Sequence, residues 1–326
     1  MQRRLEWGPF LSRISTPLVF IVTFLIFWAF SPGHRFVDPR NLAAIAKLTP
    51  DLGVVALGVG VLMICGEFDL SIASVLPLSS FLFAQWLIAG VDPFVALALM
   101  LPIGASFGLL NGLLVARTGL PSFIITLSTM LFWRGVLYVV SGLMPISILP
   151  YVPTASDFTH FLTGVVGPIP VQLLWFLGIA VGLGIMLHLG RFGNWIYATG
   201  SNPDAARAMG IDTRLVKIVC YMIVSTLCAF AGIMQATRLG SFTASQGLGF
   251  ELKAIAAVVV GGTSLRGGAG SMLGIALGVF IIQIIDNGLI LLQVPVFGVN
   301  TFIGLAVIVF VIINNLVNRQ FAEQTT

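Results

Sequence analysis

The strongest constraint on this fold is a succession of apolar runs, each about 20 residues long and able, as a helix, to cross a hydrocarbon core of about 30 Å. The mean hydropathy is +1.05, and 58% of the 326 residues are hydrophobic whereas 9% are charged. A soluble core of this chain length does not need so much apolar surface. The sequence therefore predicts an all-α polytopic membrane protein in which residues 1–326 form a single transmembrane domain.

Glycine, proline and charged residues divide the apolar runs into about ten predicted spans. These spans cover residues 17–31, 48–65, 70–89, 94–115, 120–141, 171–189, 214–236, 250–263, 271–293 and 298–316. The eighth run is short for a full span, and the segment after it, 261–270, contains five glycines. We expect one element here to be broken or re-entrant, and the sequence leaves open whether 66–74 is re-entrant as well; such irregular backbone must be covered by protein or water.

The distribution of lysine and arginine predicts the orientation, because these residues concentrate in cytoplasmic loops. Threading ten spans from a cytoplasmic N-terminus leaves ten of the 16 basic residues inside, namely Arg3, Arg4, Arg13, Arg117, Arg191, Arg207, Arg214, Lys217, Arg266 and Arg319. Both termini are then cytoplasmic. The basic start followed by an apolar run also suits a signal peptide, but Pro32 directly after Ser31 disfavours cleavage there, and we interpret the run as a span.

One polar segment, 191–212, interrupts the apolar chain between the sixth and seventh spans. It contains the signals of a miniature helix: Asn202 is a good N-cap, Pro203 suits the first helical position, Asp204 suits the positive end of the helix dipole, and Gly210 suits the left-handed position after the helix. The helix is completed by Ala205, Ala206, Arg207 and Met209. Two turns are marginal alone, so we expect a supporting surface beneath them and a protein partner above.

Two runs carry glycine at every fourth position, which places the glycines on one helix face and lets another backbone approach closely. They are Gly104, Gly108 and Gly112 in the fourth span and Gly270, Gly274 and Gly278 in the ninth. Tight helix packing is the plainest interpretation. The equivalent positions of the two triplets also suggest that spans two to five and seven to ten form an inverted repeat, as in many transporters.

Polar residues within the apolar runs are costly and are therefore candidates for function. The candidates for lining a pathway are Asp69, Asn111, Ser122, Thr126, Thr129, Trp133, Gln283, Asp286 and Asn287. Such groups suit hydrogen bonding to a small hydroxylated solute. An equally weighted alternative is structural, since serine and threonine often bond to their own helix backbone and charges at span ends reach the interface. Glu251 and Lys253 fit an interfacial role.

No catalytic or metal-binding residues are expected on this chain. The three histidines are isolated, and the three cysteines fall in apolar runs, so we interpret the cysteines as buried hydrophobic residues. The GGTSLRGG sequence at 261–268 lacks the GK[ST] ending of a phosphate-binding loop, so any ATP must be bound by another subunit. The net charge of +4 forms no dense basic patch that would favour nucleic acid.

Four segments together identify a resemblance to the membrane-spanning permeases of bacterial ABC-type monosaccharide importers, the ribose/xylose/galactose group. The resemblance covers nearly the whole chain and is carried by GEFDLSIAS at 66–74, GLLNGLLVARTGLPSFIITLSTMLFWRG at 108–135, RFGNWIYATGSNPDAARAMGID at 191–212 and ELKAIAAVVVGGTSLRGGAGS at 251–271. Phe68 departs from the isoleucine often found there, and Ile72-Ala73 from valine-glycine, which puts the local conformation of 66–74 in question.

The resemblance implies an importer subunit in the bacterial inner membrane that works by alternating access. It implies a coupling helix at Asn202–Met209 seated on an ATP-binding cassette subunit, which carries the ATP and magnesium. It also implies a second permease copy, identical or not, and a periplasmic sugar-binding protein. Within the family, a polyol, a nucleoside or a furanose-like signalling molecule is an alternative cargo.

Two alternatives lie outside the family. An ion-coupled secondary transporter would use Asp69 and Asp286 as proton or sodium sites, and its uptake would collapse with an uncoupler while ATP stays high. A passive channel for polyols is the other. Both leave the 191–212 segment unexplained.

Overall fold

The computed structural model describes residues 7–295, 298, 301–302, 304–305 and 308. The helices are α1 (Trp7–Phe30), η1 (Pro32–Val37), α2 (Pro39–Ile64), α3 (Ile72–Ile88), α4 (Pro93–Thr118), α5 (Ser122–Ser141), α6 (Asp157–Thr163), α7 (Val171–Leu189), α8 (Arg191–Ser201), α9 (Pro203–Ala208), α10 (Thr213–Leu239), α11 (Phe250–Val260) and α12 (Met272–Leu291). Two antiparallel two-residue ladders pair β1 (Ile146–Ser147) with β4 (Ser241–Phe242), and β2 (Val165–Val166) with β3 (Ile169–Pro170).

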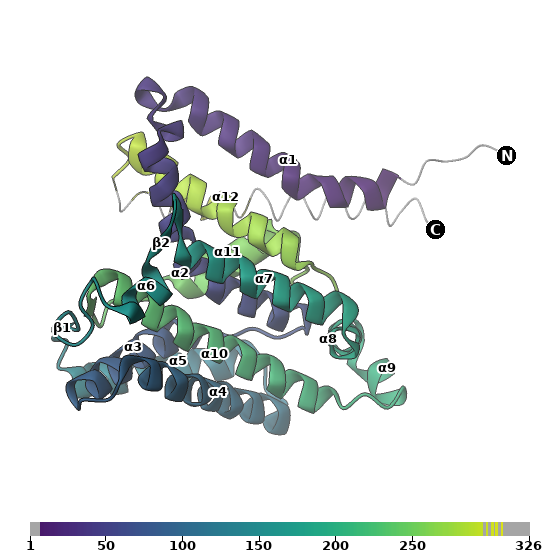
Figure 1. The fold of residues 1–326 in the computed structure, drawn as a ribbon. Helices are drawn as coiled ribbons and strands as arrows, with labels where there is room; N and C mark the ends of the chain where they lie inside the picture. Colours follow the sequence, from purple (N-terminus) through teal and green to yellow (C-terminus); the bar gives the residue numbers. More distant parts are fainter. Residues whose placement is uncertain (1–6, 296–297, 299–300, 303, 306–307, 309–326) are drawn as a thin grey trace.

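The long helices form one bundle, with α8 and α9 at one end and β1, β2 and α6 at the other (Figure 1). Within the described residues, α2, α4, α5, α7, α10 and α12 are long and apolar enough to cross a membrane, and α1 and α3 contribute shorter apolar stretches. The predicted polytopic helical membrane protein is confirmed. Ten full spans are not, because α11 has only 11 residues and most of the predicted span at 298–316 lies outside the described residues.

Polar caps and glycines set the ends of the membrane helices. Asp92 begins α4 by accepting hydrogen bonds from the amides of Phe94 and Val95 at 2.9 and 3.2 Å. Gly119 ends α4 and Gly240 ends α10, both in the left-handed conformation that glycine adopts without strain. These signals lie in short polar links, so each apolar run forms one helix.

The centre of the bundle is the pair α2 and α10. In their most apolar stretches 89% of α2, 67% of α12 and 61% of α10 is buried, compared with 17% for α5 and α7, which leaves α5 and α7 on the outside. Helix α10 packs against α2, α3 and α4, and α2 packs against α7, α11 and α12. Together α2 and α10 therefore contact α3, α4, α7, α11 and α12.

Glycines permit the closest of these packings. On α4, a Cβ atom added at Gly108 would lie 2.5 Å from the Tyr221 carbonyl carbon of α10, and Gly104 and Gly112 lie on the same face. On α12, Gly274 and Gly278 face Gly261 and the end of α11. Gly270 departs from the predicted helical register because α12 begins only at Met272; it lies in the preceding loop, beside Thr263 and Ile64.

Two interruptions break the bundle at corresponding places, before α3 and before α11. The Phe68 amide donates to Ser122 Oγ at the start of α5, and Ser74 Oγ, near the start of α3, donates to the Met130 carbonyl further along α5. Ser122 and Met130 are eight residues apart, which is about 12 Å along an α-helix. Helix α3 therefore begins about 12 Å inside the bundle, measured from the start of α5. The second interruption, 240–249, reaches the same region, since a Cβ atom added at Gly247 would lie 3.2 Å from the Ala73 carbonyl oxygen. Thus two non-helical segments lead to the N-termini of two short helices that lie close together.

Candidate coupling segment and translocation pathway

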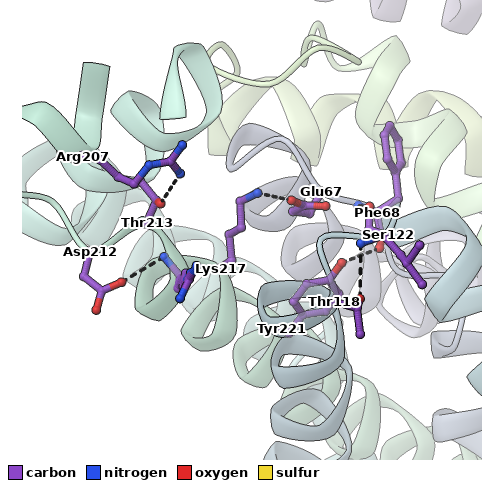
Figure 2. A network of polar contacts seen from close by, with 11 residues as sticks. Glu67, Phe68, Thr118, Ser122, Arg207, Asp212, Thr213, Lys217 and Tyr221 are labelled. Carbon is purple, nitrogen blue, oxygen red and sulfur yellow. Dashed lines mark hydrogen bonds and ion pairs between the residues drawn. The ribbon is translucent and has the colours of Figure 1, made fainter. Parts of the chain in front are cut away.

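The non-helical segment 66–71 is held at Phe68 by two helices, α5 and α10. Its Phe68 amide donates to Ser122 Oγ of α5 at 3.1 Å, and the Phe68 carbonyl accepts from the Tyr221 hydroxyl of α10 at 3.0 Å, as Figure 2 shows. Both backbone groups of a residue outside regular structure are thereby satisfied inside the bundle, which apolar surroundings require. Tyr221 was not among the predicted site residues, because a tyrosine in an apolar run gives no distinct signal.

A buried polar cluster fixes the other end of this segment. One Asp69 oxygen, Oδ1, accepts from the Ser71 amide and the Ser71 hydroxyl at 2.8 and 2.6 Å. Asn111 Nδ2 of α4 donates to Ser71 Oγ at 2.8 Å. Asp69 and Ser71 have no exposed surface, and Asn111 is 1% exposed. The cluster brings together two predicted pathway residues, Asp69 and Asn111, through a serine that sequence reasoning missed.

An ion pair connects the same segment to the N-terminal part of α10. Lys217 pairs with Glu67, and both side chains are largely covered. One turn earlier, Arg207 Nη1 of α9 donates to Thr213 Oγ1 at the start of α10, at 3.2 Å. Figure 2 shows this succession of contacts from α9 through α10 to Glu67 and Phe68. One hydrogen bond, one turn of α10 and one ion pair therefore connect α9 to segment 66–71.

The predicted miniature helix is confirmed as α9. Asn202 Oδ1 caps it by accepting from the amides of Asp204 and Ala205 at 3.1 and 3.0 Å, Pro203 is its first residue, and Gly210 takes a left-handed conformation. Among its residues, Ala206 is buried, whereas Met209 is 83% exposed. An apolar side chain presented to water at the tip of the molecule suits contact with a partner. Its coupling role stays a prediction.

Helix α8 is a part of the polar segment that the sequence reasoning did not anticipate. Its buried residues are Gly193, Ile196, Thr199 and Gly200. Three- and four-residue spacings of this kind mark a helix with one face against the protein. The polar composition of 191–201 concealed this pattern, because only Ile196 among the four is strongly apolar.

Glycines join α8 to segment 66–71 and to the 261–270 loop. A Cβ atom at Gly200 would lie 2.6 Å from the Gly268 nitrogen and nearer still to the Ile64 carbonyl oxygen at the end of α2. The Gly268 amide donates to that Ile64 oxygen at 2.8 Å. Gly267 in turn contacts Gly66. We call Gly66, Gly200, Gly267 and Gly268 the glycine joint; it places segment 66–71, the 261–270 loop and α8 in direct backbone contact.

A side-chain hydrogen bond reinforces the same connection. The Tyr197 hydroxyl of α8 donates to the Gly270 carbonyl at 2.8 Å. Burial raises the pKa of the Tyr197 phenol, so the hydroxyl remains protonated and able to donate. The 261–270 loop is therefore attached to α8 at two points and leads directly into α12.

The remaining predicted pathway residues are mostly engaged in structural contacts. Thr126 Oγ1 donates to the Ser122 carbonyl and Thr129 Oγ1 to the Thr126 carbonyl, both on their own helix. Trp133 packs edge-to-face on Phe107, with ring centroids 4.9 Å apart.

The α12 candidates likewise form local pairs. Asp286 pairs with Lys253 at 3.3 Å, Asn287 exchanges hydrogen bonds with Asn41 at 2.9 and 3.0 Å, and Gln283 is buried. Among the described residues, no hydrogen bond or ion pair joins the α5 candidates to those of α12.

Two arginines within apolar helices form buried contacts that the sequence did not predict. Arg134 of α5 reaches the α3 N-terminus, where Nη2 donates to the Ala73 carbonyl, and its Nη1 donates to the Ala244 carbonyl at 3.0 Å. Arg238 of α10 pairs with Asp51 of α2. An arginine inside an apolar run is itself a signal that a buried partner exists, but sequence alone does not name the partner.

The part of the chain that the structure describes contains no group of three or more histidine, cysteine, aspartate or glutamate residues able to hold a metal ion. Cys65, Cys220 and Cys228 are buried and free. The contacts of this region connect α8 and α9 to segment 66–71 and to the 261–270 loop inside a helical bundle.

Comparison with known proteins gives consistent matches over almost the entire chain. A family model described as "Branched-chain amino acid transport system / permease component" matches residues 41–314. The ribose import permease protein RbsC of Bacillus subtilis is 35% identical over 313 residues, covering 96% of each chain. The xylose/arabinose import permease protein XylH of Sulfolobus acidocaldarius is 31% identical, covering 97% of this chain and 86% of the relative.

A third relative, the D-allose transport system permease protein AlsC of Escherichia coli, is 32% identical, covering 95% of this chain and 94% of its own length. No solved structure matches the chain significantly.

Proposed function

Because the chain belongs to the family of branched-chain amino acid transport system permease components, we propose that it is the membrane-spanning subunit of an ATP-binding cassette importer for a monosaccharide. The family description names amino acids, but ribose, xylose or arabinose, and allose are the cargoes named in similar proteins of nearly equal length. The short helices α3 and α11, whose buried residues are mainly small or apolar, and the small polar groups around them suit a neutral hydroxylated solute better than an amino acid, whose two charges need partners.

The observation that carries the proposal is the connection from α9 to the bundle interior. Met209 at the tip is exposed, and α8 beneath it contacts the end of α2 and the 261–270 loop through the glycine joint. A compact, capped helix on a rigid support is what transmission of a nucleotide-driven motion requires, since loosely held segments absorb displacement. The ATP-binding subunit with its magnesium sits on α9 in this proposal.

Packing exchanges between helices support an inverted repeat of spans two to five and seven to ten. Helix α4 packs against α10, and α12 packs against α2. If the fourth span corresponds to the ninth and the second to the seventh, these are the same contact made twice. Each half also contains one short helix after an irregular segment, α3 and α11. Half-helices at a repeat interface are a feature of transporter binding regions.

The remaining parts of the proposal follow from this role. Ten spans place both termini, α8 and α9 in the cytoplasm and the β ladders outside, in a bacterial inner membrane. A second permease copy completes a central path, and a periplasmic binding protein delivers the sugar. Rocking of the two repeats would expose the segments before α3 and α11 to one side at a time.

The test is uptake of labelled D-ribose, D-xylose and D-allose into vesicles containing the permease with its ATP-binding and sugar-binding partners. We expect accumulation that requires both internal ATP and the binding protein. Uptake that ignores ATP and collapses with an uncoupler would instead identify an ion-coupled transporter. Accumulation of a polyol or nucleoside but no monosaccharide would retain the ABC mechanism and correct the cargo.

The coupling assignment has a separate test at Met209. Because this side chain is 83% exposed, Met209→Asp leaves the fold intact but places a charge in the proposed interface. We expect the ATP-binding subunit to be lost during purification of the complex, and uptake with it. The matched control is Val166→Asp, an exposed apolar residue at the opposite end of the bundle. Equal retention of the ATP-binding subunit in wild type and Met209→Asp would contradict the assignment.

A further inference from the structure

A cavity of about 320 Å³ opens at the end of the bundle opposite α9. Tyr138 and Leu143 form one wall at the end of α5, and Thr243, Ser245 and Leu248 form the other in the irregular segment before α11. None of the residues that line it takes part in the coupling contacts of α8 and α9, which lie at the other end of the molecule. Its volume is at the small end of the range for ligand pockets, about 300 to 1,000 Å³.

The two walls are fixed relative to each other, so the cavity is a built feature. Behind Leu143, strand β1 pairs with β4, with Ile146 opposite Phe242. Deeper in the bundle, Arg134 donates to the carbonyls of Ala244 and Gln246 at 3.0 and 3.5 Å. The same helix, α5, carries Tyr138 one turn beyond Arg134, and the guanidinium lies 6.0 Å from the Tyr138 ring centroid. The arginine therefore joins both walls.

The polar groups of this region suit a neutral polyhydroxylated ligand. Thr243 and Ser245 offer hydroxyl groups, which both donate and accept hydrogen bonds, and Tyr138 offers an aromatic ring. The two hydroxyls lie next to each other, since Ser245 Oγ is 3.5 Å from Thr243 Oγ1.

The second wall of the cavity is continuous in sequence with residues that pack against α3. The segment that forms its second wall continues to Gly247, where an added Cβ atom would lie 3.2 Å from the Ala73 carbonyl oxygen. That carbonyl is at the N-terminus of α3, so the cavity and the two short helices are separated by only a few residues of one segment.

We propose that this cavity is the entry site for the sugar, in which a single monosaccharide ring stacks on Tyr138 and hydrogen-bonds to Thr243 and Ser245. The inference rests on the proposed importer function and adds the place where the released sugar is first held. Leu143 and Leu248 cover the less polar face of the ring. The ligand is neutral, since Arg134 is already engaged by backbone carbonyls.

The experiment measures D-ribose uptake and ATP hydrolysis together, in vesicles containing the assembled transporter, at saturating sugar-loaded binding protein. The double variant Thr243→Val with Ser245→Ala removes two hydroxyls with little change of shape. We expect its uptake per ATP hydrolysed to fall about tenfold, the loss that two hydrogen bonds of ordinary strength produce. Tyr138→Ala gives a comparable loss and Tyr138→Phe restores most of it. The control is Ser147→Ala, an exposed hydroxyl outside the cavity.

The two rates separate the possible outcomes. Retained ATP hydrolysis with reduced uptake supports the entry site and shows that the variants fold and assemble. A parallel loss of both rates, with a higher concentration of binding protein needed for half-maximal stimulation, would assign the cavity to docking of the binding protein and overturn the proposal. Unchanged uptake in the double variant and in Tyr138→Ala would overturn it as well. Absence of ATP-dependent uptake in the wild type would instead refute the importer function itself.

Discussion

A single methyl group at Gly200 tests whether α8 transmits motion to the bundle. In Gly200→Ala, the new Cβ atom would lie 2.6 Å from the Gly268 nitrogen, whereas ordinary contacts begin at 3.4 Å, so the two backbones must separate by at least 0.8 Å. The hydrogen bond from Gly268 to the Ile64 carbonyl, 2.8 Å long, lies beside this contact.

The cost can be worked from these contacts. Overpacking costs about 1 to 3 kcal/mol, and losing one hydrogen bond adds about 0.5 to 1.5 kcal/mol. The better helix propensity of alanine offsets about 1 kcal/mol. We therefore expect a net destabilisation of about 1 to 3 kcal/mol at the joint, enough to change a conformational equilibrium there about five- to thirtyfold or more.

The assay compares thermal unfolding, ATP hydrolysis and uptake in the purified, reconstituted complex. We expect Gly200→Ala to keep the ATP-binding subunit and its hydrolysis but to lose most uptake per ATP, because α9 is intact while its connection to α2 is displaced. Gly182→Ala on α7 is the control, since nothing lies within 4 Å of its added Cβ atom. If Gly200→Ala matched this control in melting temperature and in uptake, the argument from the glycine joint would be refuted.

Two further predictions concern the bundle itself. Gly108→Ala lowers the melting temperature more than Gly112→Ala. The added Cβ atom lies 2.5 Å from the Tyr221 carbonyl carbon in the first case and 2.8 Å from the Ile218 Cα atom in the second. Thermal unfolding in detergent measures both shifts, and equal shifts would contradict the prediction. Lys217→Met or Glu67→Gln alone lowers the free energy of unfolding by about 1 to 3 kcal/mol, because the remaining charge loses its partner in a largely covered site. The double variant recovers part of this loss. Additive losses in the double-mutant cycle would exclude a direct interaction.

Several features of the site were predictable because they depend on neighbours in sequence. The cap at Asn202, the proline after it and the left-handed Gly210 are local signals, and α9 forms where they predict it. The segment 66–71 begins where the second predicted span ends, at residue 65, but the sequence left open whether it is re-entrant. Helix α8 was not predicted, because its buried face consists mainly of glycine and threonine, whose burial depends on α2 and α7 lying beneath it.

The pathway candidates illustrate the opposite case. Helical spacing put Thr126 and Thr129 on one face, yet their hydroxyls bond to carbonyls of their own helix. Asp286 and Lys253 were separate candidates until the packing of α11 on α12 paired them. Gly270 kept a four-residue spacing but lies outside α12, since a loop before a helix can mimic its register in sequence.

The sequence alone determined that this chain is a helical membrane protein with one exposed polar segment, because hydrophobic length and helix caps act over a few turns of chain. Only the tertiary structure decided that α2 and α10 form the centre of the bundle. It also decided that the segments before α3 and before α11 meet inside the bundle, and that the four glycines of the glycine joint come together from three separate segments. Those facts depend on how close two distant backbones come, and a glycine in a sequence does not state which backbone it will meet.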